Sequence, residues 1–106
     1  MPKYMIEATY TQQGAQGLMK EGGSGRRAAV EAVAKGLGGS VESFYYAFGK
    51  TDAYVIVDLP DDTTAVAIAM AINASGAATL STVQLLTPED IDAAAKKSVG
   101  YRRPGG

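Results

Sequence analysis

The order of the periodic segments restricts the fold of this chain more than any other feature of the sequence. Residues 1–11 alternate between two sides, with Tyr4 and Ile6 on one and Lys3 and Met5 on the other, which is the period of a β-strand. Helical and extended segments then follow one another to the end of the chain. The predicted strands are 1–11, 40–49, 53–60 and 77–86, and the predicted helices are 12–20, 26–37, 61–75 and 88–99.

This order is β-α-β-β-α-β with a terminal helix, the split βαβ arrangement of ferredoxin-like domains. Right-handed crossovers place both long helices on one face of a four-stranded antiparallel sheet. We therefore predict an α+β, ferredoxin-like βαββαβ fold with an extra C-terminal helix. The 106 residues are expected to form a single domain over 1–99, followed by a short tail over 100–106.

Residues at the segment ends indicate where the helices begin and end. Glycines at 22 or 23 and at 76 are expected to end two of them. Thr87 followed by Pro88, with Asp90 three positions after Thr87, is typical of a capped helix start. The side chains expected to face the sheet are Val30, Val33, Ala34 and Leu37 from one helix and Ala65, Ile68 and Ile72 from another.

The second and third strands carry apolar or aromatic side chains on both faces, although the helices cover only one. A large exposed aromatic face requires a partner. We expect at least a homodimer through the helix-free face, with aromatic side chains of the second strand in the contact. Depending on the register these are Phe44, Tyr46 and Phe48 or Tyr45, and Phe44 and Tyr46 are the pair whose change to Lys should disrupt it. The alternative is that the last helix folds under this face.

The composition excludes several classes of site. The chain has no Cys and no His, which excludes disulfides, thiolate chemistry, zinc fingers and histidine-ligated metals. We expect no cofactor and no metal. A net charge of −1 gives no field that attracts nucleic acid or an anionic membrane. With no signal peptide and no apolar run long enough to span a bilayer, the expectation is a cytoplasmic protein without nucleic-acid or membrane partners.

Two long runs, GLMKEGGSGRRAAVEAVAKGLGGSVESFYYAFGKTDAYVIVDLPDD and NASGAATLSTVQLLTPEDIDAAAKKSVGYRRPGG, resemble the GYD-domain family. The resemblance covers nearly the whole chain and implies a dimeric α/β-barrel protein. Gly49 and Asp52 match the Gly-x-Tyr-Asp motif that names the family, whereas Thr51 stands where the family has Tyr. A role for that phenol is therefore not transferred, and the family implies no particular reaction.

Three residues are candidates for catalysis: Asp52, Glu7 and Tyr46. Asp52 either bonds turn amides or acts as a general base at the mouth of the cleft between sheet and helices. Glu7 lies mid-strand on the face opposite Ile6, where it either pairs with a cation across a dimer or takes part in catalysis. Tyr46 either packs in the core or interface, or lines a cleft that binds an aromatic substrate.

The stretch KEGGSGRR, residues 20–27, is the one candidate anion site. Its spacing fits neither a Walker loop nor a dinucleotide fingerprint. It is either a hinge with solvated arginines or a weak anion site at a helix start. The site would use Gly23, Ser24, Arg26 and Arg27, unless Ser24 caps the helix instead.

Two classes of function remain open. The first is an oligomeric small-molecule-binding domain or cofactor-independent enzyme, with a cleft between sheet and helices that takes a small anionic or aromatic ligand. The alternative is a non-catalytic oligomeric assembly or partner-binding module. Polar groups converging on an enclosed cavity would favour the first, and a filled cleft would favour the second.

Overall fold

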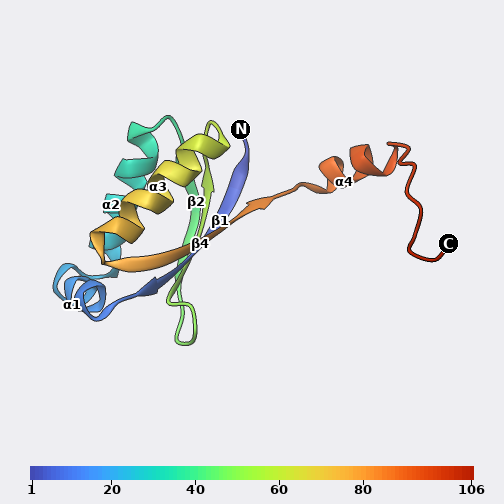
Figure 1. Cartoon of the computed structure of the whole chain (residues 1–106). Helices are drawn as coiled ribbons and strands as arrows, with labels where there is room; N and C mark the ends of the chain where they lie inside the picture. The colour runs from blue at the N-terminus through green and yellow to red at the C-terminus, as the bar shows by residue number, and fades with distance from the viewer.

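The computed structural model describes all residues, 1–106, as four strands and four helices. The elements in chain order are β1 Lys3–Tyr10, α1 Gln12–Glu21, α2 Gly23–Gly36, β2 Ser40–Tyr46, β3 Ala53–Asp58, α3 Asp62–Ser75, β4 Ala78–Leu85 and α4 Pro88–Ala95. The strands form one antiparallel sheet in the order β2-β3-β1-β4, with α2 and α3 on the same face (Figure 1). This confirms the predicted α+β, ferredoxin-like fold.

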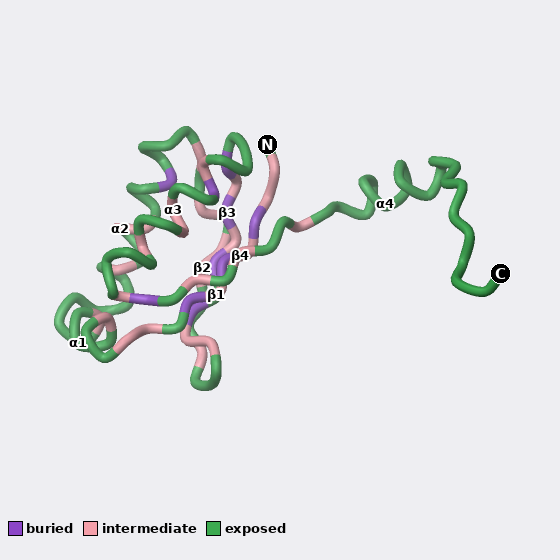
Figure 2. Tube along the Cα trace, viewed as in Figure 1, coloured by how far each residue is buried: buried purple, intermediate pink, exposed green.

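The core lies between the sheet and these two helices. Burial is confined to the body of the molecule, as Figure 2 shows in purple. Leu59, directly after β3, is completely buried. The other buried side chains are Tyr4, Ile6, Ala8, Ala34, Ala53, Val55, Val57, Ala65 and Ala78. The alternation predicted for β1 is confirmed, because Tyr4, Ile6 and Ala8 are buried while the residues between them are not.

The helix ends follow the capping signals closely. Gly22, at φ 84°, separates α1 from α2, and Gly76, at φ 77°, ends α3 in the left-handed conformation that glycine tolerates best. Thr87 and Asp90 form the reciprocal capping box expected before α4. Three bounds differ from the prediction by three residues or more. Helix α2 begins at Gly23 rather than Arg26, because Gly22 alone makes the break, β2 ends at Tyr46 rather than Gly49, and α4 ends at Ala95 rather than Val99.

The register of β2 contradicts one prediction. A bulge between Val41 and Ser43 sets the strand so that Phe44 pairs with the buried Val55 and Tyr45 pairs with Tyr54. Phe44 and Tyr46 therefore lie on the side of the helices, with their ring centroids 5.1 Å apart. Their expected place in a contact through the helix-free face is wrong. Tyr45 is the β2 aromatic that this face presents.

Residues 86–106, which we call the arm, leave the body instead of folding under the sheet (Figure 1). The arm contains α4 and extends the molecule to 57 × 33 × 23 Å, with a radius of gyration of 17.0 Å. A compact chain of this length has a radius of gyration of about 13 Å. None of the helices combines the length and the apolar character needed to cross a bilayer.

Candidate functional site

A cavity of about 410 Å³ lies between α2, α3 and the sheet. It is the candidate functional site because small-molecule sites occupy about 300–1,000 Å³ and are mostly apolar. All but one of its lining residues are hydrophobic, and the exception is Arg26. Its walls include Ile6 and Val55 from the sheet.

Small side chains leave this space open. Helix α2 packs mainly over β2, and α3 mainly over β4, so the central strands lie beneath the gap between the helices. The wall formed by α3 includes Ala67 and Ala71, whose side chains are too short to fill the gap. The helix faces predicted to point inward, from Val30 to Leu37 and at Ile68 and Ile72, do line the cavity.

Polar groups gather at one end of the cavity, where β1 and β2 end and α2 begins. Arg26 and Tyr10 line it there, and Tyr46 donates its hydroxyl to the Gly23 carbonyl at 3.0 Å. The Arg26 Nη1 lies 3.8 Å from the nearest Glu21 carboxylate oxygen, a long and half-exposed ion pair. The guanidinium therefore keeps most of its hydrogen-bonding capacity for another acceptor.

The two phenols at this end are held in the neutral form. Burial is the main cause that raises the pKa of Tyr10 to about 12, with the neighbouring Tyr46 adding to it. Burial also raises the pKa of Tyr46. At neutral pH both hydroxyls are protonated, but that of Tyr46 is donated to Gly23, so Tyr10 and the positively charged Arg26 are the groups that face a ligand. This end of the cavity is therefore suited to an acidic group.

The predicted anion-site residues lie in the first turn of α2. Gly23 and Ser24 are inside the helix rather than in a loop, and Ser24 makes no cap, because the capping residue is Gly22. The structure separates the two arginines. Arg26 lines the cavity, whereas Arg27 is exposed and lies 4.0 Å from Glu31 on the surface.

The three catalytic candidates are not brought together. The Asp52 carboxylate accepts a 2.8 Å hydrogen bond from the backbone amide of Tyr10. It therefore binds the last residue of β1 rather than an amide of the hairpin turn. Glu7 lies on the helix-free face and accepts a 3.3 Å hydrogen bond from Thr51. Tyr46 lies on the other side of the sheet, where its hydroxyl contacts Gly23 at the start of α2.

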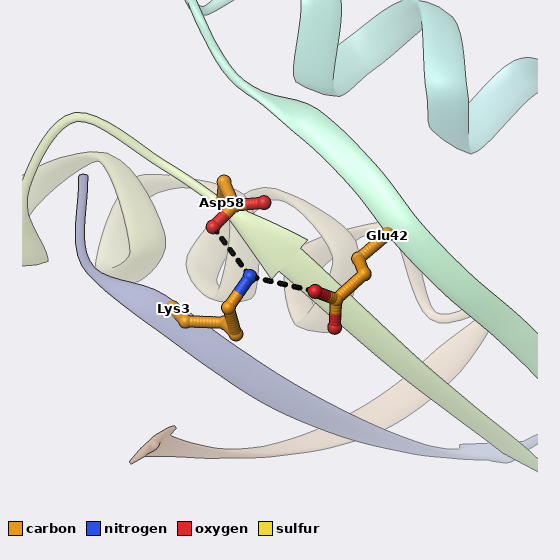
Figure 3. A network of polar contacts seen from close by, with 3 residues as sticks. All are labelled: Lys3, Glu42 and Asp58. Carbon is orange, nitrogen blue, oxygen red and sulfur yellow. Dashed lines mark hydrogen bonds and ion pairs between the residues drawn. The ribbon is translucent and has the colours of Figure 1, made fainter. Parts of the chain in front are cut away.

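A charged cluster on the helix-free face ties three strands together (Figure 3). The Lys3 ammonium lies 2.8 Å from both Glu42 and Asp58, and these contacts raise the pKa of Lys3. Within one chain Lys3 therefore pairs with these two carboxylates and not with Glu7. No group of three or more His, Cys, Asp or Glu side chains is placed to hold a metal ion.

Sequence reasoning did not select Tyr10 as a site residue, although it is the phenol that lines the cavity. The signal was present: the alternation of β1 puts Tyr10 on the same side as Ile6 and Ala8. Tyr10 is one of several strand tyrosines that could line such a cleft, and the sequence does not rank it above Tyr46, since most of them serve packing or an interface.

A protein-family model matches most of the chain. The model of the GYD domain matches residues 4–95, which covers the sheet, its helices and α4. No curated protein and no solved structure gave a match. Because the match spans most of the 106 residues, the chain belongs to the GYD-domain family.

Proposed function

We propose that this protein binds a small organic acid with an apolar body in the cavity between α2, α3 and the sheet. The observation that carries the proposal is an apolar cavity of about 410 Å³ with a single cation, Arg26, at one end. Burying the apolar body supplies the affinity, and the guanidinium together with Tyr10 supplies the selectivity for an acid.

The length of the cavity fits an elongated ligand. Arg26 and Leu37 both line it and lie eleven residues apart on one helix and its cap. This separation corresponds to about 16 Å along the axis. A medium-chain carboxylate placed with its head at Arg26 extends its chain toward Leu37 and Leu59.

The lining residues favour binding over catalysis. No carboxylate lines the cavity, and the raised pKa of Tyr10 leaves that phenol a poor general base at neutral pH. The groups present can hold an acid and exclude water from its apolar part. These are the properties of a carrier or sensor for such a compound.

The test is thermal unfolding with decanoate and decan-1-ol as probes. Decanoate is expected to raise the unfolding midpoint more than decan-1-ol, because only the acid uses Arg26. Arg26→Gln should remove the difference between the two probes. Arg27→Gln is the matched control and should leave it unchanged, since Arg27 lies outside the cavity.

A cavity-filling variant tests the location. Ala71→Leu adds side-chain volume to the cavity wall and should abolish stabilisation by both probes. Equal stabilisation of this variant and the natural protein would show that the probes bind elsewhere and would overturn the proposal.

We also propose that two copies pair through the helix-free face, as the second function candidate, oligomeric assembly, requires. This face exposes Tyr45 (71%), Val83 (44%) and Tyr54 (38%) on three different strands. Apolar area of this kind on a sheet is usually covered by a second layer.

Sedimentation velocity at micromolar concentration measures the pairing. Tyr45→Lys combined with Tyr54→Lys should shift the protein from dimer to monomer. Phe48→Lys is the control, because Phe48 is fully exposed in the hairpin loop after β2 and should not affect association. A natural protein that sediments as a monomer contradicts the pairing.

A further inference from the structure

The arm, residues 86–106, carries apolar side chains that contact nothing in their own body. Leu86, Ile91, Val99 and Tyr101 are exposed to 63%, 55%, 79% and 71%. The hydrogen bonds recorded within the arm are local, such as Ile91 to Thr87 and Tyr101 to Val99. A helix this short is not stable on its own and gains its stability by packing its apolar side against another surface.

Local chemistry directs the arm away from its own body. Thr87 is extended, with φ −79° and ψ 161°, as expected for a residue that precedes proline. The capping box of Thr87 and Asp90 then fixes where α4 begins. The chain therefore continues outward along the direction of β4 (Figure 1).

A second surface of the molecule also exposes apolar side chains that its own chain does not cover. A groove of about 330 Å³ runs between α3 and β4, with Tyr4 and Ala65 of the core among its lining residues, and we call it the flank groove. Val66 and Met70 line it and are 55% and 66% exposed. The hydroxyl of Thr82 lies in the same groove, is shielded from solvent and has no hydrogen-bond partner.

The arm carries both signs of charge. Glu89, Asp90 and Asp92 lie in α4 around Ile91, and the four cations Lys96, Lys97, Arg102 and Arg103 follow toward the end of the chain. In the docked arm the acidic side chains face solvent, and only the segment after α4 brings positive charge toward the groove. Asp62 lines the flank groove, and Asp61 adjoins it at the start of α3.

We propose that the arm of one copy docks in the flank groove of a second copy, with the side chain of Ile91 between Val66 and Met70. This inference rests on the proposed pairing through the helix-free face. Two sheets packed face to face lie about 10 Å apart, and their own side chains fill that space. A helix about 10 Å wide does not fit there, so we place the arm on the partner's flank rather than between the sheets.

The exchange is symmetric, which is why a second copy is the occupant. Each copy has one arm without a docking surface and one groove without a ligand, and a two-fold axis satisfies both pairs at once. The 21 residues of the arm are also comparable to the 20–30 residues, roughly, that each partner contributes to a stable interface.

Photo-crosslinking of the full chain tests the exchange. A benzoylphenylalanine is placed at Ile91, and protein of natural isotope content is mixed in equal amounts with ¹⁵N-labelled protein. After irradiation, peptides joining the two isotopes are expected, linking position 91 to the segment that contains Val66 and Met70. The same probe at Met19, which is 86% exposed on α1, is the control and should give no such links.

Association measured on point variants completes the test. Ile91→Glu and Met70→Glu should each weaken the dimer by about tenfold or more, since each places a charge in the contact. Met19→Glu should not. Links confined to one isotope, showing an arm folded onto its own body, overturn the exchange. So does a dimer with no link to the flank groove, although it retains the sheet-face pairing. A monomeric natural protein overturns both proposals.

Discussion

The two faces of the sheet are built from the same four strands, but the side chains of one face are buried and those of the other remain accessible to solvent. The helix-covered face holds Tyr4, Ile6, Val55 and Val57, which are at most 7% exposed. The helix-free face holds the alternating residues of the same strands, and none of them is buried. Tyr45 there is 71% exposed, although Phe44 beside it packs against the core.

The helix-covered side of the sheet is complete within one chain, and the helix-free side is not. The covered face has its second layer of helices, and the space left between the layers is a ligand-sized cavity. The helix-free face and the arm have no second layer within the chain. A period of two along β1 and β3 therefore distributes apolar residues to one face for folding and to the other for association.

The largest expected effect is a difference in the unfolding free energy lost when a side chain is shortened on the helix-covered side or on the helix-free face. Leu59→Ala should lower the free energy of unfolding by about 2–5 kcal/mol, because it removes a completely buried side chain from the core. Ile56→Ala, on the helix-free face, should cost clearly less at a dilution where the protein is monomeric, and should weaken association instead. Urea unfolding and sedimentation measure the two quantities. Equal unfolding costs would remove the distinction between the faces.

The second prediction concerns the close contact between α1 and the residue that precedes β4 on the helix-covered side. A Cβ on Gly14 in α1 would lie 1.8 Å from the carbonyl oxygen of Ala77, so Gly14→Ala must push α1 away from the start of β4. We expect a loss of about 1–3 kcal/mol in the free energy of unfolding.

Gly17→Ala is the matched control on the same helix. A Cβ there meets nothing within 4 Å, so the change should stabilise the protein by up to about 1 kcal/mol through helix propensity. Opposite signs in urea unfolding are the expected result. A loss at both positions would show that α1 is not positioned by this close approach.

The fold was predictable because its signals are local. The alternation of β1, the glycine at 76 and the capping box at Thr87 each fix an element without knowledge of the rest of the chain. The faces of β2 were not predictable, because one bulge between Val41 and Ser43 exchanges the two sides of the strand.

The candidate site was predictable only in part. Arg26 was identified from its place at a helix start, but its separation from Arg27 depends on the rotation of α2 over the sheet. The cavity itself depends on how far apart α2 and α3 lie, which is a property of the packed layers and of short side chains such as Ala71. No local pattern in the sequence encodes that distance.

The third prediction uses tyrosine ionisation to distinguish the faces. The tyrosines with raised pKa values, Tyr4 and Tyr10 at about 12 and Tyr46, all lie on the helix-covered side. For Tyr4 the main cause is the hydrogen bond that its hydroxyl donates to Asp62, and for Tyr10 it is burial. The pKa of these phenols is higher in the folded protein than the unfolded value of about 10. The stability that their protonated hydroxyls contribute to the folded state is therefore fully present below about pH 10. It is lost as the pH rises toward 12.

Absorbance at the tyrosinate band measures this titration directly. The natural protein should show a component that ionises near pH 12 and disappears on unfolding, and Tyr10→Phe should reduce its amplitude. Tyr101→Phe is the control, because Tyr101 lies in the arm and is 71% exposed. If Tyr10→Phe leaves the component that ionises near pH 12 unchanged, the burial of the Tyr10 phenol is contradicted.

The smallest expected effect concerns the charged cluster of the helix-free face. Lys3 bridges Glu42 and Asp58, but its side chain is 31% exposed, and ion pairs in contact with water contribute little to stability. Lys3→Met should lower the urea midpoint slightly at low salt, and the difference should shrink at high salt because the pairs are screened.

Lys50→Met removes the same charge from a lysine without an ion pair and is the matched control. If both substitutions lower the midpoint equally, net charge and not the cluster is responsible. If Lys3→Met alone lowers it and also weakens association, the cluster orders the helix-free face for its partner.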